Sequence, residues 1–362
     1  MSHATSLPSL PVPRDVVASL PVYSKAGGAL APLWRASSNE SFLTPSPAVL
    51  AAIGSAAQHC QQYPTIDGDP LIKALSQQLG IAQDLLVTGG GSLAVLQQLL
   101  TAFAGPGKDV VFAWRSYEAY PILVRLTGAL DVQVPLTANH RHDLPAMAHA
   151  VTDSTAAIIL CSPNNPTGTV LGSQELEEFL ASIPAHVLVV LDQAYLEFTD
   201  DAETSFQHIL TLRVKYPNLV LLRTFSKAYG LAGLRAGFLV AHPDISRHVR
   251  AVSPPFGLNA VAESASVAAL ADTEALAANI ATVRAGRSNL QAQLAARGID
   301  VPASGGNFLW LPVGDASAAL EGACLAESVS VRCFPGEGVR VSVGSRQAEA
   351  AVLSGVDRWQ RS

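Results

Sequence analysis

Seven short apolar runs alternate with helical stretches over the first two thirds of this chain. The runs cover 85–88, 109–113, 131–135, 156–161, 187–191, 219–223 and 236–240. They are continuous in Val, Ile and Leu and do not alternate with polar residues, as expected of strands that are buried on both faces. Segments of helical period, such as 93–102 and 173–183, lie between them. This order predicts a doubly wound α/β fold with a mainly parallel seven-stranded sheet covered by helices.

The pattern changes after residue 249. Two prolines and a glycine interrupt it at 253–259, and an alanine-rich helical stretch of about 260–297 follows. Short strands are expected near 308–311, 329–333 and 339–343, with a final helix after Arg346. The expected organisation is an N-terminal arm (1–35) that packs with the small domain, a large domain (36–249) and a small α+β domain (250–362).

Composition excludes several classes of function. Only 14% of the residues are charged and the net charge is −6, so no basic field supports nucleic-acid binding. The four cysteines form no C-x-x-C pair and no Cys/His group has zinc spacing, which predicts reduced thiols and no metal. No signal peptide or long apolar run is evident, so we expect a cytoplasmic protein without membrane contact.

The stretch RTFSKAYGLAGLRAG (223–237) places Lys227 after a strand, among small hydroxylated residues. A lysine that reacts as a nucleophile needs partial desolvation and nearby cationic or dipolar groups that lower its pKa. Thr224, Ser226 and Arg235 are residue types that hold a phosphate dianion. The stretch resembles the cofactor-lysine motif of class I and II aminotransferases, especially the histidinol-phosphate branch. The resemblance implies fold type I, pyridoxal 5'-phosphate as cofactor, and Lys227 as both its covalent attachment point and the catalytic base.

Two more motifs follow apolar runs. CSPNNPTG (161–168) has the composition of a turn, and VVLDQAYLEF (189–198) ends a strand with Asp192. A carboxylate buried there needs a partner. Without other information, a neighbouring arginine or a helix N-terminus would serve equally well. The resemblance implies that Asp192 faces the protonated ring nitrogen of the cofactor. It also implies that Asn165 and Tyr195 reach the phenolic oxygen.

The turn VTGGGSL (87–93) lies between a strand and a helix. Glycine-rich turns of this kind bind phosphate through backbone N–H groups, although a plain tight turn has the same composition. The resemblance implies that Gly91, Ser92 and Leu93 contact the cofactor phosphate.

Two tyrosines have roles implied only by the resemblance. Tyr117, in WRSYEAYP (114–121), would stack on the pyridine ring, whereas the alternative is packing in the core. Tyr63, in QYPTIDG (62–68), would reach the phosphate held by a neighbouring subunit. The expected working unit is therefore a homodimer with shared active sites.

The strand VRVSVG carries an arginine among apolar residues, and such an arginine needs an anion or a domain edge where it reaches water. The resemblance implies that Arg340 binds the anionic end of the substrate, commonly its α-carboxylate. Arg332 in SVRC and Asn307 in GGNFLW are expected in the same pocket. Tyr23, in LPVYSKAGG, is expected to cover the substrate.

The resemblance extends over nearly the whole chain, and it is strongest to actinobacterial aromatic amino acid (phenylalanine) aminotransferases. It implies transfer of the amino group of phenylalanine, tyrosine or tryptophan to 2-oxoglutarate. Histidinol-phosphate aminotransferase is the first alternative. A decarboxylase or lyase of this fold, an inactive regulatory protein and a nucleotide-binding oxidoreductase are the others, although no G-x-G-x-x-G fingerprint is complete.

Overall fold

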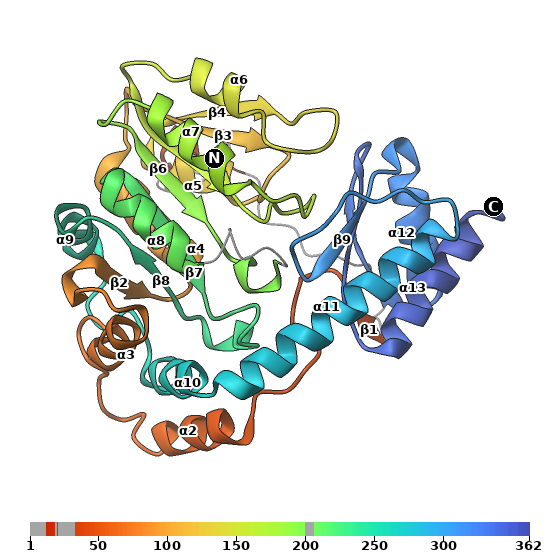
Figure 1. Cartoon of the computed structure of the whole chain (residues 1–362), viewed down its shortest axis with the longest axis horizontal. Coiled ribbons are helices and arrows are strands. Elements are labelled where there is room, and N and C mark those ends of the chain that lie inside the picture. The colour runs from red at the N-terminus through yellow and green to blue at the C-terminus, as the bar shows by residue number, and fades with distance from the viewer. Residues whose placement is uncertain (1–11, 19, 21–32, 200–205) are drawn as a thin grey trace, which may run out of the picture.

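The computed structural model describes residues 12–18, 20, 33–199 and 206–362. A large sheet with helices on both faces lies beside a smaller group of strands and helices, and the long helix α11 runs between them (Figure 1). Tyr23 lies outside the described residues.

All seven predicted strands form one sheet, which confirms the expected fold class. Its order is β2 (Leu86–Gly89), β8 (Gly237–Val240), β7 (Leu219–Thr224), β6 (Leu188–Asp192), β5 (Thr155–Cys161), β3 (Asp109–Trp114) and β4 (Leu130–Pro135). The pairs from β7 to β4 are parallel, whereas β8 is antiparallel to both of its neighbours. Every residue of β5, β6 and β7 is buried, because helices cover both faces of these strands.

Two apolar cores lie on the two faces of this sheet. One contains side chains of α4 (Ser92–Phe103), α5 (Tyr120–Thr127) and α9 (Pro243–Val252). The other contains side chains of α2 (Pro47–Ala57), α3 (Asp69–Leu79), α6 (Leu144–His149), α7 (Ser173–Ser182), α8 (Phe206–Lys215) and α10 (Ala260–Ala271). The sheet is therefore the middle of three layers, as doubly wound folds require.

The C-terminal part forms a third, smaller apolar core. Antiparallel strands β11 (Arg332–Phe334), β12 (Gly338–Ser342) and β9 (Phe308–Leu311) pack with α11 (Thr273–Ala295), α12 (Ser317–Ala326) and α13 (Arg346–Trp359). The short strands β1 (Trp34–Arg35) and β10 (Val329–Ser330) form a parallel pair at its side. Single 3-10 turns cover Gln83–Leu85, Leu196–Phe198, Ala232–Leu234 and Gly314–Ala316.

The expected continuous helix over 260–297 is wrong in one respect. The chain breaks at Asp272, whose carboxylate accepts a hydrogen bond from the N–H of Ala275 and so caps α11. As a result α10 packs against α2 and α3, whereas α11 extends to the small sheet. The arm is also divided: α1 (Asp15–Ala18) contacts α5, and β1 pairs with β10. The domain boundaries given above stay a prediction.

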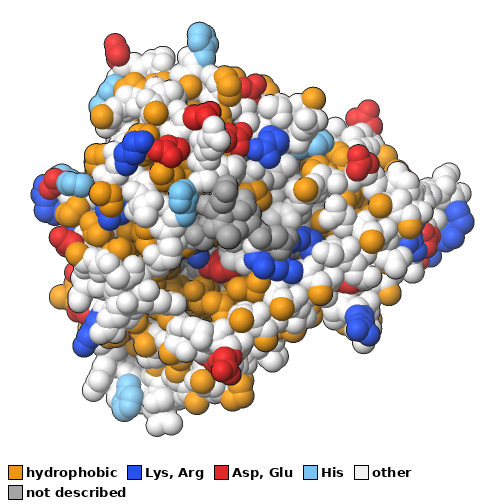
Figure 2. Space-filling model, viewed as in Figure 1, with side chains coloured by type: hydrophobic (Ala, Val, Ile, Leu, Met, Phe, Trp, Pro, Cys, Tyr) orange, Lys and Arg blue, Asp and Glu red, His pale blue; other side chains and the backbone are white. Residues whose placement is uncertain are grey.

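The surface shows no field of one charge on the face drawn in Figure 2, where acidic and basic side chains are interspersed. Within the described ranges, no helix has both the length and the apolar character needed to cross a bilayer. No cluster of His, Cys, Asp and Glu side chains able to hold a metal ion was found among the described residues.

Candidate active site

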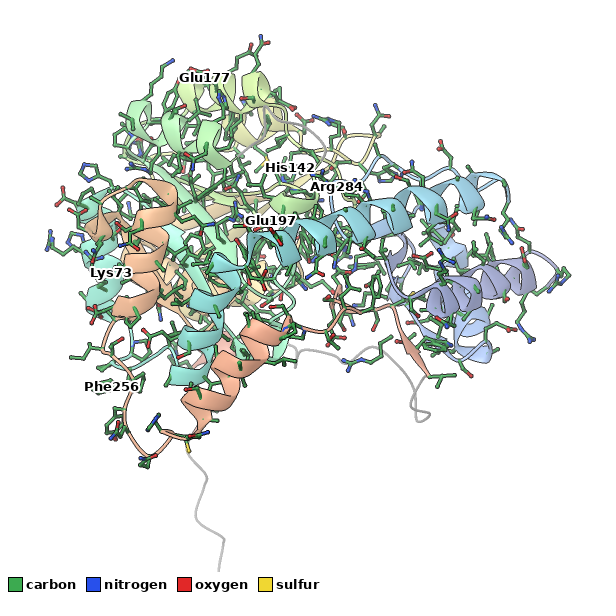
Figure 3. The ribbon with its side chains drawn as sticks, turned by 60° about the horizontal axis from the view of Figure 1, so that its bottom comes forward. Lys73, His142, Glu177, Glu197, Phe256 and Arg284 are labelled. Carbon is green, nitrogen blue, oxygen red and sulfur yellow. The ribbon has the colours of Figure 1, made fainter. Side chains whose placement is uncertain are left out.

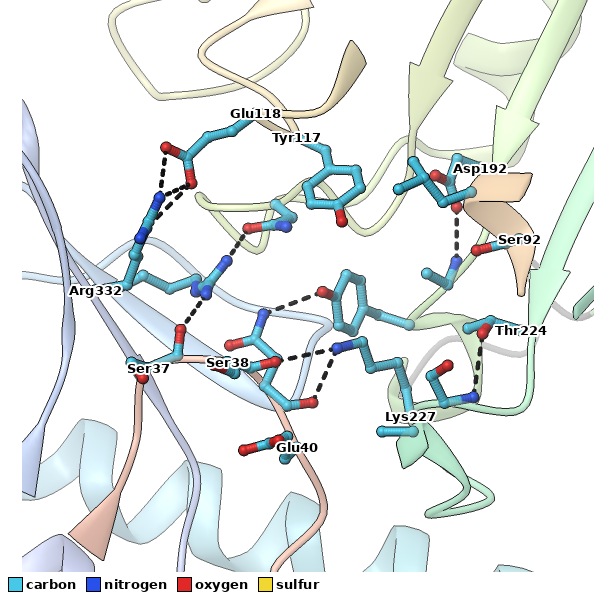
Figure 4. A pocket seen from close by; sticks show the side chains of 18 of the residues that line it. Ser37, Ser38, Glu40, Ser92, Tyr117, Glu118, Asp192, Thr224, Lys227 and Arg332 are labelled. Carbon is cyan, nitrogen blue, oxygen red and sulfur yellow. Dashed lines mark hydrogen bonds and ion pairs between the residues drawn. The ribbon is translucent and has the colours of Figure 1, made fainter. Parts of the chain in front are cut away.

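A cavity of about 580 Å³ opens at the carboxyl ends of the parallel strands, between the large sheet and the three-stranded sheet. This edge is where open α/β sheets bind ligands. Twelve of the residues singled out from the sequence line it: Ser92, Leu93, Tyr117, Asn165, Asp192, Tyr195, Thr224, Ser226, Lys227, Arg235, Arg332 and Arg340. Their side chains come from separate strand ends and loops and converge on one space (Figure 4).

The Lys227 amine lies in this cavity, just beyond the end of β7. It donates to the backbone carbonyls of Ser38 and Asn39 at 3.2 and 3.1 Å, and it lies 5.5 Å from the centre of the Tyr195 ring. Burial and the neighbouring Arg340 lower the pKa of the amine from its usual range to about 7. A lysine in this state supplies a neutral, nucleophilic amine near neutral pH.

Asp192 is the last residue of β6, and its carboxylate is buried. It accepts a hydrogen bond from the hydroxyl of Tyr120 at 2.8 Å and another from the N–H of Ala194 at 3.2 Å. Burial raises the pKa of Asp192 to about 6, and the Tyr120 hydrogen bond opposes this rise. The carboxylate is therefore positioned by a tyrosine and faces the cavity, where it can pair with a cationic group.

The N-terminus of α4, Ser226 and Arg235 form a cradle for an anion. The first N–H groups of any α-helix have no partner within the helix and attract anions. An Arg235 Nη donates to the Ser226 hydroxyl at 3.2 Å. A Cβ on Gly91 would lie 2.6 Å from Arg235 Nη2, and a Cβ on Gly237 would lie 2.2 Å from the N atom of Ser92. Gly237 is therefore required by its close approach to the backbone, whereas a side chain at Gly91, where φ is +95°, would displace the Arg235 guanidinium. The donor set suits a phosphate.

Arg340 crosses the cavity from β12. Its guanidinium, which is buried, donates to the side-chain oxygen of Asn165 and to the carbonyl oxygen of Ser37. Because the side-chain oxygen of Asn165 accepts from Arg340, its amide nitrogen is the atom that can donate to a ligand. Tyr195 accepts a hydrogen bond from the amide of Asn39 at 3.0 Å, and burial raises the pKa of Tyr195 to about 12, so its hydroxyl stays protonated.

Three of the predicted site residues that the structure describes do not line the cavity. Gly91 lies behind it against Arg235, and Asn307 lies beside it, where its amide donates to the carbonyl of Asn39 at 3.1 Å. Tyr63 is 83% exposed on the loop between α2 and α3, and its ring stacks on Phe256 with centroids 4.7 Å apart. Phe256 lies at the edge of the molecule beside that loop (Figure 3).

Sequence reasoning missed several cavity residues. Segment 35–40, which starts at the last residue of β1 and leads toward α2, contributes five residues that surround the Lys227 amine or line the wall beside it. Glu118, which lines the cavity, and Tyr120, which does not, both lie within the recognised motif WRSYEAYP, but nothing local indicated that they bond to Arg332 and Asp192. The polar run SSNES at 37–41 is the one sequence signal for this segment.

Comparisons with known proteins agree with this geometry. The family model described as aminotransferase class I and II matches residues 36–353. Curated relatives named aromatic amino acid aminotransferase are 43% identical over 96% of this chain in Streptomyces avermitilis and 44% identical over 95% in Thermobifida fusca; the matches cover 97% and 96% of those proteins. A crystal structure of histidinol-phosphate aminotransferase from Sinorhizobium meliloti, in complex with pyridoxal-5'-phosphate, has a TM-score of 0.88 at 25% identity and covers 98% of this chain and 99% of its own.

Proposed function

Because this chain belongs to the class I and II aminotransferase family, we propose that it transfers the amino group of an aromatic L-amino acid to 2-oxoglutarate. It is a pyridoxal-phosphate-dependent aminotransferase. The proposed donors are phenylalanine, tyrosine and tryptophan, and the products are the aromatic 2-oxo acid and L-glutamate. The observation that carries the proposal is the presence of the Lys227 amine and the buried Asp192 carboxylate in one cavity. The aromatic class rests on what the curated relatives are named.

The residues present fit the cofactor. The cradle at α4, with Ser226 and Arg235, supplies backbone, hydroxyl and guanidinium donors for its phosphate. We assign Ser92, Leu93 and Thr224 to the same phosphate end, whereas Gly91, whose N–H donates to the carbonyl of Gly89, leaves room for the Arg235 guanidinium beside them.

The ring end has its own set of partners. Asp192 would hold the ring nitrogen, Asn165 and Tyr195 the phenolic oxygen, and Tyr117 one face of the ring. When bound, pyridoxal phosphate supplies a ring that accepts the electrons released as a bond at the substrate Cα breaks.

The chain's own residues then bind, orient and move a proton. Arg340 would bind the α-carboxylate of the substrate and so fix the orientation of the Cα–H bond. Lys227 would be the general base that takes the Cα proton, and its pKa of about 7 suits that role near neutral pH. Asp192 keeps its negative charge through the hydrogen bonds from Tyr120 and Ala194.

The proposal is tested by initial rates of amino transfer to 2-oxoglutarate from phenylalanine, tyrosine, tryptophan and histidinol phosphate. We expect the aromatic amino acids to have the larger kcat/KM, and Lys227→Ala to reduce turnover by several orders of magnitude, about what removal of an acid–base catalyst and nucleophile costs. The histidinol-phosphate alternative is favoured by the solved neighbour of that name. A larger kcat/KM for histidinol phosphate than for every aromatic donor would replace the proposed substrate class.

The working unit proposed here is a homodimer with shared sites. It is supported by the stacked, exposed pair Tyr63 and Phe256, with the exposed Ile66 nearby on the same loop. In this arrangement Tyr63 of one subunit reaches the phosphate end of the other site. The test mixes Lys227→Ala with Tyr63→Ala after dissociation and reassociation. A hybrid has one site without either defect only if the residues come from different subunits, so recovered activity is expected, and the absence of recovery contradicts shared sites.

A further inference from the structure

One end of the cavity contains an ion pair formed within the chain. The Glu118 carboxylate accepts from Arg332 Nε at 3.1 Å and from Arg332 Nη2 at 2.8 and 2.9 Å. Both side chains line the cavity, with exposed fractions of 27% and 12% (Figure 4). An arginine expected to be open to a substrate anion is therefore already engaged by a carboxylate through its planar fork.

Arg332 and Arg340 lie directly opposite each other in the antiparallel β11–β12 ladder, and both side chains line the cavity. Two like charges opposite each other repel, so Glu118 offsets that repulsion. The two arginines differ in their named contacts. Arg340 donates to the neutral oxygens of Asn165 and Ser37, whereas Arg332 donates to a carboxylate.

Substrate anions differ in how many donors they need. A carboxylate is matched by one guanidinium through two parallel hydrogen bonds. A phosphate ester carries about two negative charges and three acceptor oxygens, so it gains from a second guanidinium. The second guanidinium is that of Arg332, which lies opposite Arg340 in the β11–β12 ladder and donates to the Glu118 carboxylate.

We infer that Glu118 is a specificity-determining residue, because it competes with any second negative charge of the ligand for Arg332. The inference rests on the proposed function and deepens it. Phenylalanine presents one carboxylate to Arg340 and leaves the Glu118–Arg332 pair intact. A phosphate must displace Glu118 or lie close to its negative charge. The doubly charged 2-oxoglutarate meets the same competition and binds more weakly than it would without Glu118.

A second ion pair provides a matched control. Arg115, on the same loop as Glu118, pairs with Glu337 in the turn between β11 and β12. Neither residue lines the cavity. Glu337→Gln therefore removes one carboxylate between the same loop and the same hairpin, without changing the charge at the cavity wall.

The test measures binding of two inert ligands to the holoenzyme by spectral titration. 3-Phenylpropanoate and 2-phenylethyl phosphate share a ring and a two-carbon chain and differ only in the anion. In Glu118→Gln we expect the affinity for the phosphate to rise about tenfold relative to that for the carboxylate, the size of one charge-assisted hydrogen bond. In Glu337→Gln the ratio of phosphate affinity to carboxylate affinity should stay within about twofold of its wild-type value. The kcat/KM of histidinol phosphate relative to phenylalanine should move in the same direction.

Two outcomes overturn the inference. One is an unchanged ratio of phosphate affinity to carboxylate affinity in Glu118→Gln. A merely structural role of Glu118 predicts this result, because both affinities would then fall equally. The other needs no variant: wild-type protein that already binds the phosphate about tenfold more tightly than the carboxylate. Failure of the proposed function is a separate result, because the two ligands report on the anion site even if phenylalanine is not turned over.

Discussion

The hydroxyl of Tyr120 offers a sharp test of how the protein controls the charge of Asp192. Tyr120 is fully buried at the start of α5, where its ring packs edge-on against Phe112 and Tyr117. Its hydroxyl donates to Asp192 at 2.8 Å. Tyr120→Phe keeps the ring and its packing and removes only the hydroxyl, which also forms a hydrogen bond with Cys161. The Asp192 carboxylate then has the N–H of Ala194 as its other named donor.

The expected magnitude follows from the strength of that bond. A hydrogen bond to a charged group contributes about 1.5–3 kcal/mol, and 1.36 kcal/mol corresponds to one pKa unit, so the loss is worth about one to two units. The bond stabilises the ionised carboxylate, and its removal therefore raises the pKa of Asp192 above its present value of about 6. At pH 7 the ionised fraction would fall from about nine-tenths to about a half or less.

The assay is the affinity of cofactor-free protein for pyridoxal phosphate between pH 5 and 9, followed by absorbance. In the proposed role Asp192 would pair with the ring nitrogen only when ionised, so the midpoint of the acid limb should move up by about one unit or more, and the two proteins should converge at high pH. Tyr229→Phe is the control, since Tyr229 is another largely buried tyrosine and packs against Phe225 outside the cavity. An unchanged midpoint, or an equal loss of affinity at every pH, would refute the reasoning.

Three further predictions follow from the same contacts. Gly91→Ala should weaken cofactor binding, because its Cβ would displace the Arg235 guanidinium; Gly80→Ala, which also has a positive φ but open space, should keep normal affinity in the same titration. Arg340→Lys should lower kcat/KM for phenylalanine by about tenfold or more while cofactor affinity is retained, since an ammonium cannot replace the fork. The pKa of Lys227 is lowered to about 7, so its neutral fraction is half formed there, and the rate of cofactor attachment should rise with pH and level off above about 7; a rate still rising tenfold per unit at pH 9 contradicts it.

Much of the fold follows from local pattern. Strands β5 and β7 each contain a continuous run of apolar residues. Such a run of strand length is stable only when both faces are covered. The direction of β8 does not follow from its sequence, because hydrophobicity is the same read from either end. The break at Asp272 has a local signal, an N-cap followed by Thr and Glu, but the alanine-rich sequence on both sides conceals it.

The site divides in the same way. Lys227, Asp192 and Asn165 were found because each belongs to a motif that is contiguous in sequence and follows a strand, and parallel strands bring their carboxyl ends to one edge. The carbonyls of Ser38 and Asn39 that hold the lysine amine come from nearly two hundred residues away. No periodicity or spacing relates positions at that separation.

The sequence by itself determined which kinds of side chain are available: an amine, a carboxylate, hydrogen-bond donors suited to a phosphate, and two arginines in late strands. Only the tertiary structure decided how those charges are paired. Arg332 and Arg340 are alike as sequence features, yet folding brings Glu118 against one of them and Asn165 against the other. The physical reason is that the strength and availability of a charge depend on the groups within a few ångströms, and these come from chain segments that meet only when the chain folds.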